Sequence, residues 1–209
     1  MPPPLLHPRT KRVLESLVPF LATHPSFYLA GGTGLALQLG HRQSVDLDFF
    51  SSQPWDSRSL KTDLTALGSL SVRYEDAKTL DGALDDVKIS FFAYPYPLLF
   101  PVKSEGGIPL ADERDIAAMK LDVVSSRGSR KDFVDLYFLL KKHTIFEIFG
   151  FFQKKYQNIS YNKVHIVKSL AYFEDAEQDP DPLMVQPASW DEVKTAVLSA
   201  AKQLLPAPK

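Results

Sequence analysis

Residues 27–50, FYLAGGTGLALQLGHRQSVDLDFF, decide how this chain is interpreted. The segment predicts a short apolar strand, a Gly-Gly turn, a helix of one to two turns, and a second strand that carries two acids. Side chains alternate along a strand, so Asp46 and Asp48 share one face while Leu47 and Phe49 point into the core. The pattern therefore places two carboxylates side by side on one face of a well-buried strand.

Two neighbouring carboxylates repel each other, and a cation between them removes the repulsion. An oxygen-rich pair such as Asp46 and Asp48 suits Mg²⁺ (or Mn²⁺), which accepts a few carboxylates and leaves positions open for phosphate oxygens. The turn Gly31-Gly32-Thr33 lies just upstream at the start of a helix, where free backbone N–H groups attract anions. Together the two features indicate a metal-dependent nucleotide site.

Bulk composition indicates an ordinary globular protein of one domain or two small ones. The 209 residues are 44% hydrophobic and 23% charged, with a net charge of −1, so nucleic-acid binding would need a local basic patch. There is no cysteine, which excludes disulfides and thiol chemistry. The start, MPPPLLHPRTKR, has no apolar signal core, and no apolar run is long enough for a membrane helix. We expect a cytoplasmic protein with no membrane partner.

The first half of the chain predicts a mixed α/β unit. Apolar spacing predicts a helix over 10–22 and a second over 57–67, capped by Ser57 or Ser59. Alternation predicts strands over 69–77 and 85–97 with a turn near Asp81-Gly82, and three prolines are expected to end the sheet: Pro95, Pro97 and Pro101.

The second half is predicted to be helical from Asp112 onward. This change of character divides the chain into an α/β lobe, residues 1–104, and a helical lobe, residues 105–209, with a ligand cleft expected between them. Four phenylalanines in this half are expected to pack in the core: Phe146, Phe149, Phe151 and Phe152.

A Gly-Gly-Thr turn followed by Asp-x-Asp resembles the signature of the polymerase-beta-like nucleotidyltransferase superfamily. The wording GGTGLALQLGHRQSVDLDFF narrows the resemblance to the AbiEii/AbiGii toxin family of nucleotidyltransferases. The segments DERDIAAMKLDVVSSRGSRKDFVDLYFLL, YFEDAEQDPDPLM and SWDEVK also resemble that family, so the likeness extends over residues 10–205. It implies an α/β fold with a nucleotidyltransferase-type mixed sheet and flanking helices, followed by a helical C-terminal lobe.

The resemblance also implies an activity. Such an enzyme would transfer a nucleoside monophosphate from an NTP to a hydroxyl acceptor, either an RNA 3′ end or a protein side chain. An RNA would be reached through the basic patch at Arg127–Lys131. The chain would be the toxin of a toxin–antitoxin pair, with an antitoxin protein as a further partner.

The family motifs assign roles to residues of this chain. Gly31, Gly32 and Thr33 would hold the triphosphate, and Asp46 and Asp48 would bind the metal. Lys120 would neutralise phosphate charge, as a catalytic residue with the two acids. The remaining candidates for nucleotide contacts are Arg42, Ser44, Asp132 and Asp135.

Several of these residues have simpler explanations that the sequence leaves open. Thr33 also suits a helix N-cap, and Lys120 an exposed position. Asp132 follows Ser129 by three residues, as in a capping box, and Asp135 would need a basic partner such as Lys120, Arg127 or Lys131. His41 is expected in a turn or beside a carboxylate.

One departure from the superfamily concerns the third carboxylate that most catalytic members supply from a neighbouring strand. The candidate strand here, DDVKISFF, has the faces Lys88/Ser90/Phe92 and Val87/Ile89/Phe91, and neither contains an acid; Asp86 stands at its entrance. The site then recruits a base elsewhere, relies on metal and geometry, or binds nucleotide without much turnover. A non-catalytic nucleotide-binding or interaction module is therefore the alternative.

A hydrolase with an Asp-x-Asp nucleophile is disfavoured by Phe49-Phe50 and by the glycine turn.

Overall fold

The computed structural model describes residues 3–205 and contains a seven-stranded mixed sheet. The strand order is β3-β4-β5-β2-β1-β7-β6; β2 runs parallel to β5 and β1 parallel to β7, and the other neighbours are antiparallel. The strands are β1 (Tyr28–Leu29), β2 (Leu47–Ser51), β3 (Leu70–Glu75), β4 (Thr79–Leu84), β5 (Val87–Ala93), β6 (Lys103–Glu105) and β7 (Ile108–Leu110). This mixed sheet with helices on both sides confirms the predicted fold class.

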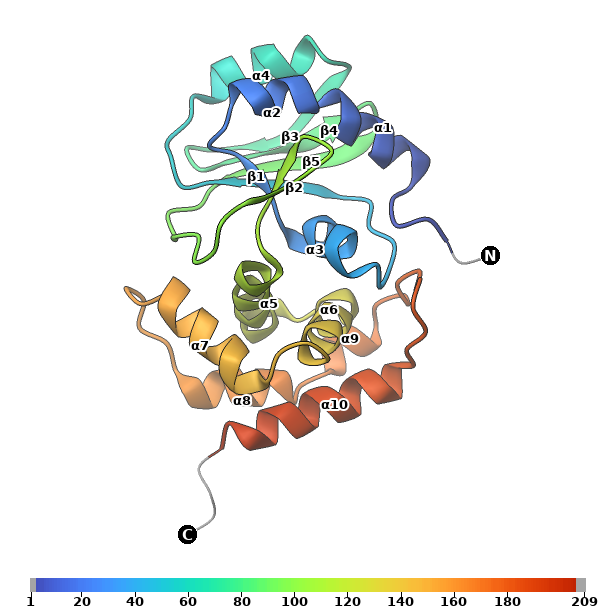
Figure 1. Cartoon of the computed structure of the whole chain (residues 1–209), viewed down its shortest axis with the longest axis vertical. Helices are drawn as coiled ribbons and strands as arrows, with labels where there is room; N and C mark the ends of the chain where they lie inside the picture. Colours follow the sequence, from blue (N-terminus) through green and yellow to red (C-terminus); the bar gives the residue numbers. More distant parts are fainter. Residues whose placement is uncertain (1–2, 206–209) are drawn as a thin grey trace.

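Three helices cover one face of the sheet, drawn at the top of Figure 1. They are α1 (Pro8–Ser16), α2 (Val18–Thr23) and α4 (Ser57–Thr65). Leu47 and Phe49 of β2 and Phe91 of β5 point to this side, and none of the three is exposed to solvent. The alternation predicted from the sequence thus places a fully apolar core between this face and the three helices.

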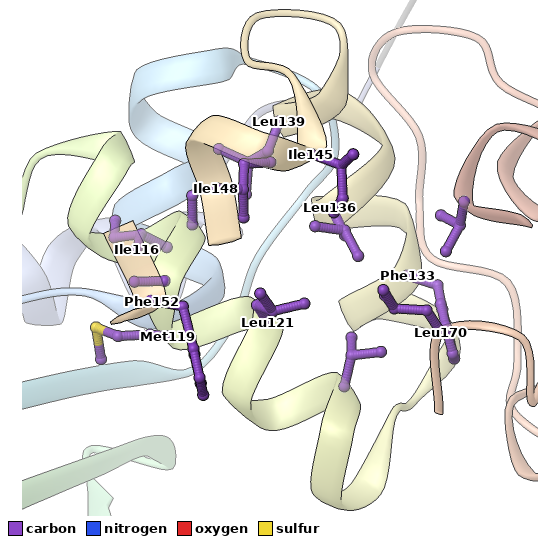
Figure 2. Close-up of a cluster of buried hydrophobic side chains, with 14 of the residues drawn as sticks. Ile116, Met119, Leu121, Phe133, Leu136, Leu139, Ile145, Ile148, Phe152 and Leu170 are labelled. Carbon is purple, nitrogen blue, oxygen red and sulfur yellow. The ribbon is translucent and has the colours of Figure 1, made fainter. Parts of the chain in front are cut away.

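The opposite face of the sheet meets α3 (Gly31–Leu39) and the helical half of the chain (Figure 1). The helices of that half are α5 (Glu113–Arg127), α6 (Arg130–Leu140), α7 (Ile145–Lys155), α8 (Lys163–Leu170), α9 (Glu174–Glu177) and α10 (Trp190–Gln203). They enclose a second core, shown in Figure 2, in which Leu121 of α5, Leu136 of α6 and Ile148 of α7 are fully buried. Tyr28 and Leu35 also belong to this core, so the sheet and α3 pack directly on the helices.

The expected helix over 10–22 is wrong in its continuity. Two helices form instead, and Leu17 lies between them as the C-cap of α1 and the N-cap of α2. The cause is Pro19, which lacks an N–H and fits only near the start of a helix. Helix α4 agrees with the prediction, but Asp56 caps it rather than a serine: its side chain accepts from the Ser59 N–H at 2.7 Å.

The strand pattern after residue 69 also differs from the prediction. Asp81 and Gly82 lie inside β4 and not in a turn, and the β4–β5 turn is made by Asp85 and Asp86, both with positive φ. Position 82 requires glycine because a Cβ there would lie 2.1 Å from the carbonyl oxygen of Ser71 in β3. At this position the glycine allows the backbones of β3 and β4 to come close together, and it does not form a turn.

The sheet continues past the proline segment. Strands β6 and β7 follow Pro101 and join the edge beside β1, so the expected boundary at residue 104 falls within β6. Phe149 and Phe152 are buried as expected and Phe151 is partly buried, but Phe146 is 58% exposed. Among the described helices, none is both long and apolar enough to cross a lipid bilayer.

Candidate active site

The two acids lie together at the start of β2, on the face that meets the helical half. Asp46 directly precedes the strand, and Asp48 is its second residue. The backbone carbonyl of Asp48 accepts from the N–H of Ala30 at 3.1 Å, which fixes the strand beside the glycine turn. Burial, together with the negative charge of Asp46, raises the pKa of Asp48. A bound cation would relieve this unfavourable pairing.

The glycine turn presses its backbone against the second acid. Gly31 opens α3 with φ +61°, and a Cβ there would lie 2.9 Å from Oδ2 of Asp48. A Cβ on Gly32 would lie 2.5 Å from a guanidinium nitrogen of Arg42. The amide groups at the start of α3 therefore lie directly beside the carboxylates, with no side chain between them.

Thr33 and Ser44 point inward, away from any ligand position. The Thr33 hydroxyl bonds to the backbone carbonyl of Asp46 and to the Ser44 hydroxyl, the latter at 2.8 Å, and both side chains are buried. The two residues hold the approach to β2 in place. The hydrogen bonds of the Thr33 and Ser44 side chains are internal to the protein, and the expected phosphate contacts of these two residues stay a prediction.

A buried charge network lies behind the acid pair. Asp135 of α6 accepts from Arg42 through Nε at 2.6 Å and through Nη2 at 2.9 Å, and it pairs with Lys120 of α5 at 2.6 Å. Lys120 also pairs with Asp132 at 2.7 Å, and His41 shares a hydrogen bond with Asp135 at 2.7 Å. Asp132 closes the capping box with Ser129 as well. Three of the simpler expectations thus hold: a capping box, a basic partner for Asp135, and a carboxylate beside His41.

The network favours the charged forms of its two acids, Asp132 and Asp135, and of Lys120. Burial alone would raise the pKa of Asp135, but Arg42 and Lys120 outweigh burial and hold it well below its usual range. Burial alone would lower the pKa of Lys120, yet Asp135 and Asp132 raise it. Burial and Asp46 raise the pKa of Asp48, and the charges of Lys88 and Lys120 offset this rise only in part, so the network acts electrostatically on the acid pair.

Two accessible lysines stand beside the first acid. Lys88 of β5 and Lys131 of α6 approach Oδ2 of Asp46 at 3.9 and 3.6 Å, and their side chains are 45% and 55% exposed. Unlike Arg42 and Lys120, they are free to turn toward a ligand. The sequence predicts Lys88 on the same strand face as Ser90 and Lys131 in the basic patch, but it does not connect either lysine with Asp46 and Asp48.

On the strand that would supply a third carboxylate, a hydroxyl lies beside Asp48, and an acid lies one strand further away. Ser90 of β5 lies opposite Asp48 in the register, and Asp81 of β4 lies opposite Ser90. The Ser90 hydroxyl donates to Oδ1 of Asp81 at 3.0 Å, and Arg73 donates to the other oxygen at 2.6 Å. Asp81 was missed because its glycine neighbour suggested a turn. Asp86, the expected substitute, is exposed and pairs with Arg9 at 4.0 Å.

The donor set suits a divalent metal that takes few protein ligands. Within residues 3–205, no cluster of three or more His, Cys, Asp or Glu is arranged to hold a metal. Asp46 and Asp48 are two hard oxygen donors next to free backbone amides, and Mg²⁺ bound through one or two carboxylates takes its other ligands from water and substrate phosphates. The residues present therefore fit Mg²⁺ as a cofactor that arrives with the nucleotide.

Comparison with known proteins decides the family. The family model described as "Nucleotidyl transferase AbiEii toxin, Type IV TA system" matches residues 12–203. The chain belongs to the AbiEii family. It is a nucleotidyltransferase, as the resemblance in residues 27–50 predicted.

Similar proteins support this membership. An uncharacterized protein of Aquifex aeolicus is 41% identical to this AbiEii-family chain over 205 residues, which is 93% of the chain and 95% of the relative. Among solved structures, MenT4, a nucleotidyltransferase toxin of Mycobacterium tuberculosis, has a TM-score of 0.63 at 14% identity and covers 95% of this chain and 84% of its own. JHP933 of Helicobacter pylori has a TM-score of 0.58 at 18% identity, covering 94% and 90%. At these identities the two structures establish a shared fold.

Proposed function

We propose that this nucleotidyltransferase moves a nucleoside monophosphate from an NTP to a hydroxyl acceptor at the Asp46–Asp48 pair. One observation carries the proposal: the bare backbone of Gly31 lies against the carboxylate of Asp48 at the start of α3. Metal-binding oxygens and anion-binding amides thus occupy one place, as a metal–triphosphate complex requires.

Residues of the chain have separate tasks in this reaction. Asp46 and Asp48 would hold Mg²⁺, which when bound supplies charge that stabilises the attacking and leaving oxygens. The amides at Gly31 and Gly32 receive the triphosphate, and Lys88 turns from Asp46 to the phosphate oxygens of the NTP. The acceptor oxygen bonds to the α-phosphorus as the bond to pyrophosphate breaks.

The buried network positions this machinery. Lys120 contributes positive charge behind the acids, while Asp132 and Asp135 hold Lys120 and Arg42 in place. Arg42 in turn lies against Gly32, so the network supports the glycine turn from behind. In this arrangement, Arg42, Asp132 and Asp135 act on the nucleotide through the groups that they hold.

The acceptor we favour is an RNA 3′ end, with a protein hydroxyl as the other possibility. Arg127 is exposed at the end of α5, and the exposed Lys131 of α6 pairs with Asp46. A phosphate backbone bound there would release counterions, so RNA binding should weaken steeply with salt. Family membership further suggests that the protein acts as a toxin restrained by an antitoxin protein.

The test is incubation of the protein with each α-³²P-labelled NTP, Mg²⁺ and either total RNA or a protein extract. We expect label to enter the acceptor with wild type and not with Asp48→Asn. A matched control is Asp63→Asn, an exposed acid on α4 that pairs with His24. Label transfer that survives in Asp48→Asn would overturn the proposal. Nucleotide-induced thermal stabilisation without transfer would favour a binding module.

A second test addresses the toxin role. Induced expression of wild type in a bacterial host should arrest growth, and Asp48→Asn at equal abundance should not. Equal arrest by both proteins would contradict a toxin that acts through nucleotide transfer.

A further inference from the structure

The face of β2 and β5 that carries Asp48 is arranged in rows that cross the two strands. Both strands run in the same direction, and their register pairs Asp48 with Ser90 and Phe50 with Phe92. Because side chains of one face recur every second residue, the aromatic row lies two residues beyond the carboxylate row on both strands. The rows are thus about 7 Å apart along the strands.

The aromatic row is continuous, and Phe50 within it also packs against the core of the helical half. The rings of Phe50 and Phe92 are 5.1 Å apart between centroids with an interplanar angle of 30°. Tyr94 meets Phe50 edge-on at 5.2 Å, and Tyr28 stacks against its far side at 6.1 Å. Tyr28 and Tyr94 therefore hold the Phe50 ring from two sides.

This row differs from the core on the other face of the same strands. Phe49 and Phe91 are wholly buried there, whereas Phe50 and Phe92 remain partly exposed. Among the described residues, Phe92 is not among the side chains packed against either hydrophobic core. Its only aromatic partner in that part of the chain is Phe50. An accessible ring beside a catalytic carboxylate row is available to a ligand.

We propose that Phe50 and Phe92 form a stacking platform for the nucleobase of the NTP. The inference rests on the proposed function, because it places the phosphates at Asp46 and Asp48. The distance from the carboxylate row to the aromatic row is of the order of one ribose unit, which joins phosphate and base in a nucleotide. Flat aromatic rings bind bases by stacking, and every base has a π-face.

The geometry assigns the platform to the NTP and not to the RNA acceptor. Lys131, which belongs to the acceptor patch, contacts Asp46. The patch therefore meets β2 at its Asp46 end, while Phe50 lies at the other end, beyond Asp48. Base and acceptor would therefore reach the carboxylates from different ends of β2.

A stacking platform makes a prediction about selectivity. Since stacking reads no hydrogen-bond pattern, the platform should contribute to the binding of all four NTPs. It should contribute nothing to the binding of a triphosphate that has no base. These two expectations separate a base site from a residue that merely supports the fold.

The experiment measures calorimetric affinities of ATP, GTP, CTP, UTP and inorganic tripolyphosphate in Mg²⁺, without acceptor. The variant is Phe92→Leu, which removes the ring and keeps an apolar side chain at a partly exposed position. The control is Phe146→Leu, which removes an exposed ring on α7. We expect Phe92→Leu to weaken NTP binding by about tenfold and to leave tripolyphosphate binding unchanged. Phe146→Leu should change neither.

The outcomes distinguish this inference from the proposed function. If wild type binds neither NTPs nor tripolyphosphate, the proposed function itself fails. If wild type binds both and Phe92→Leu leaves NTP affinity intact, the base platform is overturned. Equal weakening of NTPs and tripolyphosphate would also overturn it, because the ring would then support the phosphate site. In a separate titration with an RNA oligonucleotide, a loss of affinity in Phe92→Leu that is confined to the RNA would reassign the platform to the acceptor base and refute the NTP assignment.

Discussion

At the scale of single residues, the site separates charges that serve a ligand from charges that serve the structure. Asp46 and Asp48 repel each other near the surface, and no cationic partner compensates Asp48 fully, since its pKa remains raised. Asp135 is surrounded by Arg42 and Lys120 and has its pKa well lowered. Opposite pKa directions in acids of the same site thus mark different roles.

Replacing Asp48 with Asn should stabilise the metal-free protein. A carboxyl whose folded pKa is raised costs stability at every pH above its unfolded value, and the cost disappears as the pH falls. At pH 7 we expect Asp48→Asn to raise the Tm by a few degrees without metal. Mg²⁺ with an NTP should then stabilise wild type and not the variant, as thermal unfolding would show. A lower Tm of the metal-free variant would contradict this assignment.

Replacing Asp135 with Asn should have the opposite effect. The variant leaves Arg42 and Lys120 buried with less compensation, which costs about 3–5 kcal/mol. The stability that Asp135 adds is complete above the unfolded Asp value near 3.9 and is lost as the pH falls through the lower folded pKa. Urea unfolding at pH 7 and again near pH 3 should show the difference shrinking. A pH-independent difference would argue against the ionised network.

At the scale of elements, the start of α3 and the start of β2 form one unit. The N–H of Ala30 and the hydroxyl of Thr33 bond to the backbone of Asp48 and Asp46, and the Gly31 backbone lies against the Asp48 side chain. The helix terminus therefore sets the position of the carboxylates. The structural requirement at Gly31 is twofold: a positive φ and the absence of a Cβ.

Paired glycine substitutions separate these two requirements. Gly31 and Gly106 have similar φ values, +61° and +59°, but a Cβ on Gly106 would meet nothing within 4 Å. We expect Gly106→Ala to cost about 1–2 kcal/mol from backbone strain alone. Gly31→Ala should cost more and should also abolish NTP binding, because the new methyl displaces Asp48. Chemical unfolding and calorimetry measure the two effects; equal costs with intact binding would disprove the close-contact argument.

At the scale of the whole molecule, three sets of contacts join the sheet to the helical half. The buried network links Arg42 to α5 and α6, and the segment 41–43 pairs with 183–185, as in the Gln43 N–H bond to the Leu183 carbonyl at 2.8 Å. The third is a buried ion pair between Lys155 of α7 and Asp115 of α5, at 2.8 Å. Asp115 also accepts from the N–H groups of Leu99 and Phe100, so it holds the segment that leads from β5 to β6.

The Lys155–Asp115 pair should be essential for holding the segment after β5 on the helical half. Both side chains are fully buried, so Lys155→Met leaves an unpaired carboxylate and should cost about 3–5 kcal/mol. Lys154, its exposed neighbour, offers the control, and Lys154→Met should change stability by less than about 0.5 kcal/mol. Urea unfolding of both variants tests this. Comparable stabilities would show that packing alone holds the segment after β5.

The sequence by itself determined the local features of this protein. Strand alternation placed Asp46 and Asp48 on one face and Leu47 and Phe49 in the core, and helix patterning located the second half. Such features depend on neighbours in the chain, whose spacing along a strand or helix is fixed by backbone geometry. The family motifs are local too, which is why residues 27–50 sufficed for the fold class and the enzyme class.

Only the tertiary structure decided which charge meets which. Arg42 is buried against Asp135, 93 positions away, while Lys88 and Lys131 reach Asp46 from two different elements. Asp48, Ser90 and Asp81 form a row because β2, β5 and β4 align in register. The sequence does not reveal Asp81 as part of this row, because Gly82 beside it predicts a turn. Packing determines which residues that are distant in sequence become neighbours, and residue spacing along the chain does not predict these contacts.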